Sequence, residues 1–462
     1  MANVENYENL VIGSGGSGKF IAWNMTGGGR RTAMIERRAL GGACPNVACL
    51  PSKNIIYSAK VISLARRGAE FGLKTESMSV DMRTVQRRKR QMVEGLHQMH
   101  MELTTASGAE LIMGEARFIA PRTVEVEMRD GGRRTISGDR VFLDLGSRAA
   151  IPEVPGLAAA NPMTHVELLD LERLPEHLIV MGGGYVGLEL SQAMRRLGSK
   201  VTVIEAGQQL ASREDPDVGA ELKDLFVDEG AEVLLGAEVR EVEGRSGDRV
   251  RIHATDGHGT RIIEGSDILV ATGRKANAEG IGLEFTGVKL NEHGYIKVDE
   301  RLRTTSENIW AMGDCAGSPM FTHVAYDDFR VVFENLKGGN RTTKHRLIPF
   351  CMFTDPELAR VGLNESEARS EGIGYRLAKM PMGDVLRTRT VSERRGFMKI
   401  LIARDSDDIL GFTAFGFEAS EQMAAVQTAM IGRMPYTALR DAIFTHPTMS
   451  EGLNELLATV PS

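Results

Sequence analysis

The sequence has little that would direct it to a membrane or to an oxidising compartment. It contains no uninterrupted apolar run of about 18 residues, and its N-terminus lacks a basic stretch followed by an apolar one. We therefore expect a cytoplasmic protein with no membrane span. An excess of positive charge is also missing: the formal net charge of the 462 residues is -6, which predicts no general attraction to nucleic acid.

Proline is scarce and glycine is abundant, with 15 and 51 residues respectively. This balance is typical of many tight turns between strands and helices rather than of disorder. The length predicts about two to four domains, and a hydrophobic content of 42% provides a core of ordinary size for each.

Only four cysteines occur, and two of them lie five positions apart. Cys44 and Cys49 would be about 9 Å apart on an ideal helix, whereas a disulfide requires less than ~7 Å between the α-carbons. Either they are two unrelated, small buried residues of a loop, or the backbone between them departs from a helix. Pro45 and Pro51 favour a departure, because each removes a backbone donor. In a reducing compartment such a pair indicates catalysis or metal binding rather than a static disulfide.

The N-terminal segment has the pattern of a dinucleotide-binding unit. A short apolar strand over 9–13 leads into a glycine-rich turn and a helix through Trp23, and a second strand over 32–35 ends on Glu36. The glycines of the turn are Gly13, Gly15 and Gly18. Such glycines let a pyrophosphate approach the helix N-terminus, and an acidic residue about 20 positions further on binds a ribose.

The same pattern returns after residue 175. A strand over 178–181, a glycine turn, a helix over 188–197 and a strand over 201–204 lead to Glu205. The glycines of this turn are Gly182, Gly184 and Gly187. Two such units imply two nucleotides. An acid at the end of the second strand repels a ribose phosphate, and residues 206–209 contain no arginine to receive one, so we predict NADH rather than NADPH as the reductant.

Three further segments have recognisable patterns. Residues 60–105 have helical apolar spacing, and residues 109–145 alternate as strands do. A strand from residue 309 runs into a turn at Gly313 and Asp314. Within the helical segment, a basic run and the pair His97 and His100 could form a nucleic-acid patch or a soft-metal site. A solvated helix face is the favoured interpretation of the basic run, and ordinary helix surface and core is that of the two histidines, so we predict no metal site.

Shifts in composition divide the chain into four units. We expect boundaries that give units over 1–152, 153–274, 275–346 and 347–462. The turn that contains Gly273 and Arg274 carries the chain out of the second unit. The expected fold class is α/β, with two Rossmann-like dinucleotide-binding domains followed by a C-terminal α+β domain.

With these motifs in order, the chain resembles the class I flavoprotein pyridine nucleotide-disulfide oxidoreductases, which include lipoamide dehydrogenase, glutathione reductase and mercuric reductase. The resemblance covers nearly the whole chain. It depends on the two glycine turns, the Cys44 to Lys53 segment, Thr272-Gly273-Arg274, Gly313-Asp314, and His446 with Glu451. It implies an FAD-binding first domain, an NAD(P)-binding second domain, a central domain that completes the FAD site and a C-terminal dimerisation domain.

The resemblance also implies where the cofactors bind. FAD would lie on the first glycine turn and Glu36, with Asp314 near its ribityl chain. The nicotinamide nucleotide would lie on the second turn, and Tyr185 would shield the flavin until the nicotinamide enters. NAD is the expected nucleotide, with NADP as the alternative.

By the same resemblance, Cys49 would be the thiolate next to the flavin and Cys44 the outer sulfur that attacks the substrate. Lys53 would lie near the flavin, paired with Glu189. Electrons would pass from NADH to FAD, then to the Cys44-Cys49 disulfide, and then to an external acceptor.

His446 resembles the family's acid–base residue, and Glu451 would orient its imidazole. In that family the histidine comes from the partner subunit, so the resemblance implies a homodimer that shares its active sites.

Some positions depart from particular members of the family. Trp23 stands where glutathione reductases have an arginine, which argues against glutathione as the substrate. The sequence ends without the vicinal cysteine pair of mercuric reductases and has histidine at 446 where they have tyrosine. Asp144 and Leu145 replace the usual Ala-Thr of an Ala-Thr-Gly-Ser motif.

Three functions follow as hypotheses. The leading one is an NADH-dependent oxidoreductase of the lipoamide dehydrogenase type that acts reversibly on a small or protein-borne disulfide. The second is a reductase of metal ions or oxidants that resembles mercuric reductase. The third is a non-enzymatic FAD-binding scaffold, which would need one of Cys44, Cys49 or His446 to be missing, and none is.

Overall fold

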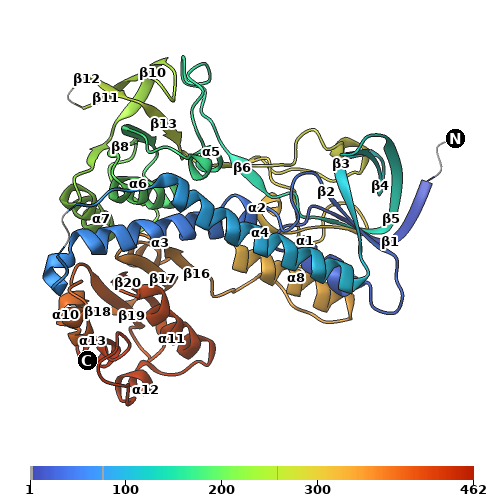
Figure 1. Ribbon diagram of the computed structural model, residues 1–462. Coiled ribbons are helices and arrows are strands. Elements are labelled where there is room, and N and C mark those ends of the chain that lie inside the picture. The colour runs from blue at the N-terminus through green and yellow to red at the C-terminus, as the bar shows by residue number, and fades with distance from the viewer. Residues whose placement is uncertain (1–3, 75–76, 258, 462) are drawn as a thin grey trace.

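The computed structural model describes residues 4–74, 77–257 and 259–461. Two units of sheet and helix are connected across a pair of long helices, and the C-terminal unit packs beneath them (Figure 1). Within the described ranges, no helix is both long and apolar enough to cross a membrane. The expected α/β class with two dinucleotide-binding units and a C-terminal α+β unit is confirmed.

The first unit is built on a six-stranded sheet in the order β1-β2-β3-β4-β5-β15, in which β1 also pairs with β5. Its strands are β1 (Val4–Ile12), β2 (Thr32–Glu36), β3 (Glu110–Ala120), β4 (Thr123–Met128), β5 (Arg133–Leu143) and β15 (Ile309–Ala311). Strands β2, β1, β5 and β15 are parallel neighbours. β1 ends in a continuous buried apolar run and β2 has one before Glu36, as strands covered on both faces do. Because β15 pairs with β5, with Ile309 opposite Val141, the segment 275–346 contributes to this sheet. The exact boundaries of the four domains stay a prediction.

Helices cover the first sheet and extend from it. They are α1 (Gly18–Met25), α2 (Ala43–Asn46), α3 (Cys49–Arg66), α4 (Met82–Ser107) and α8 (Thr322–Leu336). Helix α4 begins where the Asp81 carboxylate accepts the backbone N–H groups of residues 83 and 84, and it ends at Gly108 with φ +77°.

The continuous helical pattern expected over 60–105 is interrupted, which corrects that prediction. Helix α3 ends at Arg66, a 3-10 turn (Gly68–Phe71) follows, and Gly72 has φ +81°. Only glycine adopts this conformation readily, so the chain leaves the helix here and starts again at α4. The apolar spacing did not reveal the break because both helices carry the same period.

The second unit has a four-stranded parallel sheet in the order β13-β7-β8-β9. Its elements are β7 (His177–Met181), β8 (Lys200–Glu205), β9 (Glu232–Leu235), β13 (Asp267–Val270), α5 (His165–Asp170), α6 (Tyr185–Leu197) and α7 (Pro216–Asp228). An antiparallel sheet of β10 (Glu238–Gly244), β11 (Val250–Asp256) and β12 (Gly259–Gly265) packs on it, and a two-stranded pair of β6 (Ser147–Ala149) and β14 (Arg274–Ala276) connects it to the first unit. The expected strands at 178–181 and 201–204 correspond to β7 and β8, whereas the helix starts at Tyr185, three residues earlier than expected.

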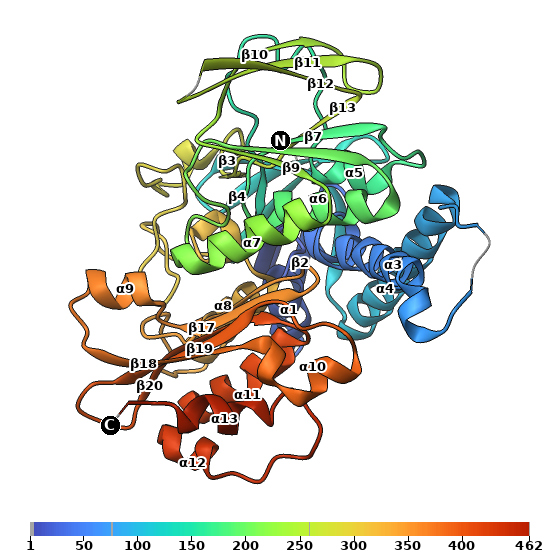
Figure 2. The same cartoon turned by 90° about the vertical axis from the view of Figure 1, so that its left-hand side faces the viewer.

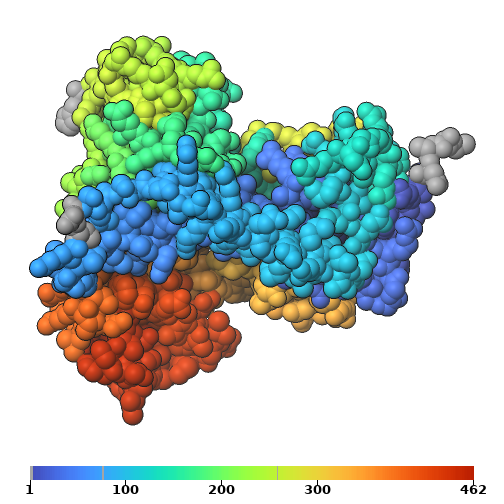
Figure 3. All heavy atoms as spheres, viewed as in Figure 1, coloured from blue at the N-terminus to red at the C-terminus, as the bar shows by residue number. Residues whose placement is uncertain are grey.

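The C-terminal unit is an antiparallel sheet in the order β16-β17-β20-β19-β18. Its elements are β16 (Pro349–Met352), β17 (Glu357–Gly362), β18 (Tyr375–Pro381), β19 (Phe397–Ala403), β20 (Ile409–Gly416), α9 (Glu365–Ser370), α10 (Leu386–Thr390), α11 (Ala419–Ile431), α12 (Tyr436–Arg440) and α13 (Gly452–Ala458). Figure 2 shows this sheet below α7, with α11 and α13 beneath it. In the space-filling view the surface is hollowed between this unit and the part of the chain that contains α8 (Figure 3).

Candidate active site

The segment between the two cysteines departs from a helix. Cys44 lies in the short helix α2, and α3 begins at Cys49. Between them Val47 has φ -139° and ψ 4°, and Ala48 has φ -133° and ψ -101°, so neither is helical. Of the two alternatives that the spacing allows, the structure therefore has the distorted backbone. Both thiols are free and half-buried.

The two thiols differ in acidity. A hydrogen bond from Cys44 lowers the pKa of Cys49 to about 6, against the opposing effect of burial, and Thr322 and the Lys53 ammonium lower it further. The Sγ of Cys49 lies 3.4 Å from the Oγ1 of Thr322. The same hydrogen bond to Cys49, followed by burial, raises the pKa of Cys44. At neutral pH Cys49 is thus the thiolate, and Cys44 holds the proton of the pair.

An ion pair lies one helical turn after Cys49. The Nζ of Lys53 is 2.7 Å from Oε2 of Glu189, which comes from α6 of the second unit. The other carboxylate oxygen of Glu189 accepts the backbone N–H of Phe353 at 2.8 Å, and the ring of Phe353 lies 4.8 Å below the ammonium. Because all three units contribute to this contact, the position of Lys53 relative to the thiols is fixed by tertiary structure.

The first glycine turn is enclosed by neighbouring backbone. A Cβ atom on Gly18 would lie 2.2 Å from the carbonyl oxygen of Gly13, and one on Gly13, which has φ +96°, would lie 2.1 Å from that of Asp144. The Glu36 carboxylate, at the end of β2, accepts the N–H and the hydroxyl of Ser14 at 3.1 and 2.6 Å. Only glycine therefore fits at residues 13 and 18, where the backbone of the turn packs directly against other backbone.

The cysteine segment packs directly on this turn. The N–H of Gly41 donates to the Oγ of Ser14 at 3.0 Å. Gly42 has φ +73°, and a Cβ there would lie 2.5 Å from the α-carbon of Gly15. The redox-candidate thiols are thus held beside the first dinucleotide unit by backbone contact.

Asp144 is a site residue whose importance the sequence did not indicate. Its buried Oδ2 accepts the N–H groups of Ser17 and Gly18, at 3.1 and 2.6 Å, at the N-terminus of α1. Burial raises the pKa of Asp144 to about 7, against the two backbone hydrogen bonds, and the Asp314 carboxylate raises it further. In the sequence, Asp144 is only a departure from a motif. Its contacts lie 126 and 127 positions away, so no local pattern indicates them.

Asp314 and Arg274 are brought together through Ser147. The Ser147 hydroxyl donates to Oδ2 of Asp314 at 2.5 Å, and the Nε of Arg274 donates to the same hydroxyl at 2.8 Å. Gly313 precedes Asp314 with φ +65°, and its N–H donates to Asp328 at 2.7 Å. Gly273, with φ +141°, has no atom within 4 Å of an added Cβ.

The second glycine turn repeats the first in geometry. A Cβ on Gly187 would lie 2.1 Å from the carbonyl oxygen of Gly182, and one on Gly182, with φ +110°, would lie 2.5 Å from that of Ala271. Glu205 accepts the N–H of Gly183 at 2.6 Å. Gly184 differs from its counterpart, because nothing lies within 4 Å of an added Cβ.

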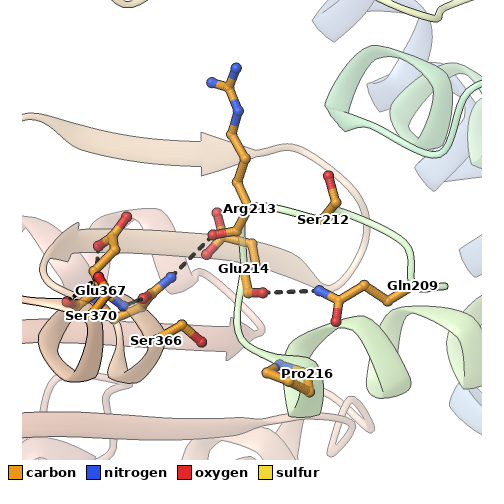
Figure 4. Close-up of a pocket in the computed structure, with 9 residues that line it drawn as sticks. Gln209, Ser212, Arg213, Glu214, Pro216, Ser366, Glu367 and Ser370 are labelled. Carbon is orange, nitrogen blue, oxygen red and sulfur yellow. Dashed lines mark hydrogen bonds between the residues drawn. The ribbon is translucent and has the colours of Figure 1, made fainter. Parts of the chain in front are cut away.

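Tyr185 opens α6 beside this turn. Its hydroxyl donates to Oε1 of Glu214 at 2.8 Å, and burial, followed by the charge of Glu214, raises the pKa of Tyr185. Figure 4 shows the loop that holds Glu214: Gln209 donates to the carbonyl oxygen of Glu214 at 2.9 Å, and Arg213 extends away from the pocket. Arg213 is an exposed cation eight residues after Glu205, beyond the four residues that the sequence argument considered.

His446 is joined to Glu451 but not to the thiols. Its Nδ1 lies 2.9 and 3.0 Å from the two carboxylate oxygens of Glu451, and its side chain is 62% exposed. Among the described residues of this chain, neither of the two hydrogen-bonds to a cysteine. The pair therefore lies on the surface, as a group that acts on another subunit would.

Two buried polar side chains, His100 and Lys19, lie near the cysteine segment. The Nδ1 of His100 lies 3.0 Å from where a Cβ on Gly41 would be, and burial lowers the pKa of His100 to about 4, so its imidazole is neutral. Lys19, which follows the first glycine turn, is buried as well, and burial lowers its pKa against the opposing charges of Cys44 and Asp144. Among the described residues, no third His, Cys, Asp or Glu completes a metal site with His97 and His100.

Two family models match the chain. Residues 7–328 match the pyridine nucleotide-disulphide oxidoreductase model, and residues 348–457 match the dimerisation domain of the same family. Among curated proteins, the chain is 32% identical to the probable pyridine nucleotide-disulfide oxidoreductase RclA of Escherichia coli, over 99% of this chain and 100% of RclA. It is 34% identical to the mercuric reductase of Acidithiobacillus ferrooxidans, over 96% of this chain and 80% of that enzyme.

Solved structures agree with these matches. A Cu(II) complex of RclA, described as an HOCl-induced flavoprotein disulfide reductase, superposes with a TM-score of 0.90 at 31% identity and covers 99% of this chain and all of RclA. LpdA from Mycobacterium tuberculosis superposes with a TM-score of 0.88 at 25% identity, over 98% of this chain and 99% of LpdA.

Proposed function

The chain belongs to the pyridine nucleotide-disulphide oxidoreductase family, and we propose that it is an NADH-dependent flavoprotein reductase in which Cys44 attacks the acceptor and Cys49 is the inner thiolate. The observation that carries this assignment is the position of Cys49, whose Sγ lies 3.4 Å from the Thr322 hydroxyl and which stands one helical turn before Lys53 on α3. The family membership makes the protein an oxidoreductase that uses FAD and a nicotinamide nucleotide. The individual roles, the choice of NADH and the acceptor are the proposal.

The residues around the first glycine turn fit FAD. The N–H groups of Gly15 and Gly16 have no protein acceptor among the described residues. The close packing of backbone around Gly13 and Gly18 leaves no room for a Cβ at either residue. These N–H groups would bind the pyrophosphate, Glu36 the adenosine ribose and Asp314 the ribityl chain. When bound, FAD would carry electrons between the nicotinamide nucleotide and the cysteine pair.

The thiol chemistry follows from the pair itself. As the Cys44 sulfur attacks one sulfur of the substrate disulfide, its proton passes to His446 of the partner subunit, and a mixed disulfide forms with release of one thiolate. His446 of the partner subunit, which Glu451 holds in place through Nδ1, then gives that proton to the released thiolate. The Cys49 thiolate attacks Cys44, which restores the Cys44-Cys49 disulfide and releases the second thiolate, and this thiolate takes a proton from solvent. The substrate gains two electrons, and the cysteine pair loses two.

Lys53 and Thr322 support the inner thiolate. The Lys53 ammonium is kept near Cys49 by its ion pair with Glu189, and both Lys53 and the Thr322 hydroxyl favour the charged form of the Cys49 sulfur. Their combined effect keeps negative charge on Cys49 rather than on Cys44 while the pair waits for substrate.

The surface position of His446 supports a dimer with shared sites. Within one chain, His446 contacts Glu451 and no cysteine among the described residues, and residues 348–457 match a dimerisation domain. A second subunit that docks through this domain would bring its His446 to Cys44. The same base would then serve both directions of the exchange.

The leading acceptor is a disulfide of the lipoamide type. A second candidate has specific support: the relatives at 30–34% identity over at least 96% of this chain include mercuric reductases, and the RclA structure is a Cu(II) complex. Two adjacent thiols, one of them a thiolate, are soft ligands suited to Hg(II) or copper. In that case the metal ion is the substrate.

Steady-state assays distinguish these acceptors. Oxidation of NADH would be followed with lipoamide, oxidised glutathione, Hg(II) or Cu(II) as the acceptor. We expect turnover with lipoamide, no more than a trace with glutathione, and loss of turnover in Cys44→Ser, with flavin reduction by NADH retained. Turnover of a metal ion without turnover of lipoamide would replace the leading acceptor by the second candidate. Full activity of Cys44→Ser would overturn the role given to Cys44.

A further inference from the structure

A cavity of about 770 Å³ lies far from the cysteines, where the ends of α3 and α6 meet the segment after α10. Its walls carry seven arginines, two glutamates and two serines. Arg66, in one wall, is 17 residues beyond Cys49 on α3, which corresponds to about 25 Å along the helix. The cavity is therefore separate from the site described above.

Some of these arginines are neutralised by carboxylates. Arg196 pairs with Glu229 at 2.6 Å and with Asp355 at 2.5 Å. Arg395 pairs with Glu393 at 2.5 Å and contacts Glu229 at 3.3 Å. Both glutamates that line the cavity are thus already paired with arginines, so among the described lining residues no carboxylate is left for the remaining cations.

Four arginines of the cavity have no carboxylate partner among the described residues: Arg66, Arg195, Arg389 and Arg394. One guanidinium nitrogen of Arg66 donates to the carbonyl oxygen of Arg196 at 2.5 Å, which leaves its charge uncompensated. The Nε of Arg195 is buried and has no hydrogen-bond acceptor. A donor without an acceptor is costly, and the Arg195 guanidinium, like that of Arg66, keeps an uncompensated charge at the cavity.

We propose that this cavity binds a small anion with two or more phosphate groups. Guanidinium groups bind phosphate oxygens in pairs of hydrogen bonds, and several uncompensated arginines in one cavity exceed what a single carboxylate or sulfate would neutralise. The volume lies within the range of small-molecule sites, roughly 300–1,000 Å³. None of the described residues that line the cavity is aromatic, so recognition rests on the phosphates rather than on stacking of a base.

The position of the cavity suggests what the anion does. Its walls come from the helix that starts at Cys49, from the helix that carries Glu189 and from the C-terminal unit. Arg67 already bridges two of these parts, because it donates to the carbonyl oxygen of Ser392 at 2.6 Å. An anion that contacts Arg66, Arg195 and Arg394 together would hold the three parts in one arrangement, so binding raises the stability of the holoenzyme.

The test uses the purified holoenzyme with inorganic tripolyphosphate, ATP or sulfate at matched ionic strength. Isothermal titration calorimetry and the thermal transition measure binding and stabilisation. We expect tripolyphosphate to bind with a Kd below about 100 µM and to raise Tm, and sulfate to bind at least about tenfold more weakly. ATP at the affinity of tripolyphosphate identifies the phosphate chain as the ligand, whereas clearly tighter ATP binding assigns a nucleotide.

Two variants keep the test specific. Arg389→Ala/Arg394→Ala removes two exposed arginines that have no ion pair, so the fold is retained, and it should weaken tripolyphosphate binding by about tenfold or more. Arg30→Ala, at an exposed arginine elsewhere that also has no ion pair among the described residues, should bind as the unaltered protein does. Equal affinity of the double variant, an equal loss in Arg30→Ala, or binding of a single-stranded oligoribonucleotide without binding of tripolyphosphate would each overturn the proposal.

Discussion

The first glycine turn is covered by three other parts of the chain, whereas the second is open at its middle glycine. Gly42 packs so close to Gly15 that an added Cβ would lie 2.5 Å from the Gly15 α-carbon. The Asp144 carboxylate accepts an N–H group at the N-terminus of α1, and the Ser17 hydroxyl donates to the carbonyl oxygen of Ala325 at 2.7 Å. Around Gly184 nothing lies within 4 Å of an added Cβ. One sequence pattern thus produces an enclosed turn and an open turn.

The carboxylates at the ends of β2 and β8 also differ in how far the protein encloses them. Glu36 is 7% exposed and accepts three donors, from the N–H and hydroxyl of Ser14 and the N–H of Arg38. Glu205 is half-buried and accepts the N–H groups of Gly183 and Gly207. An enclosed turn suits a cofactor that stays bound, and an open turn suits one that enters and leaves at each turnover. The difference comes from tertiary cover rather than from the glycine motif.

The largest expected difference is between the matched variants Gly15→Ala and Gly184→Ala. A Cβ on Gly15 would lie 2.8 Å from Oδ2 of Asp144, which must then move. Such overpacking costs about 1–3 kcal/mol and should lower Tm and the flavin content of the purified protein. Gly184→Ala should keep the Tm and flavin content of the unaltered protein and raise only the KM for NADH, because its Cβ meets no protein atom. Thermal denaturation, flavin absorbance and steady-state kinetics measure these effects.

The double variant Gly15→Ala/Asp144→Ala is the control for this comparison. If the overlap with Asp144 is the cause, removal of that carboxylate should restore part of the lost Tm, and the two changes should not be additive. Additive losses would mean that Gly15 is needed for another reason, such as the approach of the cofactor. A Tm loss in Gly184→Ala as large as that in Gly15→Ala would contradict the distinction between the turns.

A second difference is the buried acid that only the first turn has. Burial raises the pKa of Asp144 from 3.8 to about 7, so the folded protein binds this proton more tightly than the unfolded chain does. The corresponding stability is present below pH 4 and is lost as the pH rises through about 7. Asp144→Asn retains an acceptor for Ser17 and Gly18 without the charge. We expect Asp144→Asn to be more stable than the unaltered protein at pH 8, by up to a few kcal/mol at ~1.4 kcal/mol per pKa unit.

Denaturant unfolding of the flavin-free protein between pH 5 and pH 8, a window around the pKa of about 7, measures this difference. The stability advantage of Asp144→Asn should shrink as the pH falls below about 7, because the buried Asp144 carboxyl then takes up a proton and carries no charge in the folded protein. Asp314→Asn is a useful control, since the Asp314 charge is one of the groups that raise the pKa of Asp144. A stability difference that does not change with pH would show that the substitution acts through packing.

The motifs predicted the two turns because their requirement is local. Gly18 and Gly187 each face the carbonyl oxygen of the glycine five residues earlier, and those earlier glycines, Gly13 and Gly182, have positive φ. The pattern alone therefore locates β1, β2, β7 and β8. The fold class followed from their order. The cysteine spacing also indicated a broken helix, and the structure has the break at Val47 and Ala48.

The sequence did not reveal what surrounds these motifs. Thr322 meets Cys49 from 273 positions away, and Asp144 meets Gly18 from 126. His100 was considered with His97, its neighbour on the helix, although it packs against Gly41. No local period or propensity encodes such contacts. The break at Gly72 was missed for the opposite reason, because the apolar spacing before and after it is the same.

A third, smaller effect concerns the nucleotide that enters the open turn. If Glu205 determines the preference, NADH should give the higher kcat/KM, and Glu205→Arg should shift the ratio toward NADPH by about tenfold or more, because a phosphate then meets a cation instead of a carboxylate. Arg213→Ala is the matched control on the same loop. Equal use of both nucleotides by the unaltered protein would contradict the role given to Glu205. A loss of NADPH activity in Arg213→Ala that exceeds the effect at Glu205 would assign the binding of the ribose phosphate to Arg213.

The smallest effect should come from Tyr185→Phe. This variant tests whether Tyr185 covers the second glycine turn through the packing of its ring or through the hydrogen bond of its hydroxyl. The Tyr185 hydroxyl donates to Glu214 at 2.8 Å, and this bond opposes the rise in the pKa of Glu214 that burial causes. Arg360 also pairs with Glu214, at 3.1 Å, so the carboxylate keeps a partner and the loss should be about 1 kcal/mol or less. The ring remains, so NADH should reduce the flavin within about twofold of the unaltered rate, as stopped-flow absorbance would measure. A much faster reduction in Tyr185→Phe, with Tyr185→Trp unchanged, would mean that the hydroxyl rather than the ring holds the turn closed.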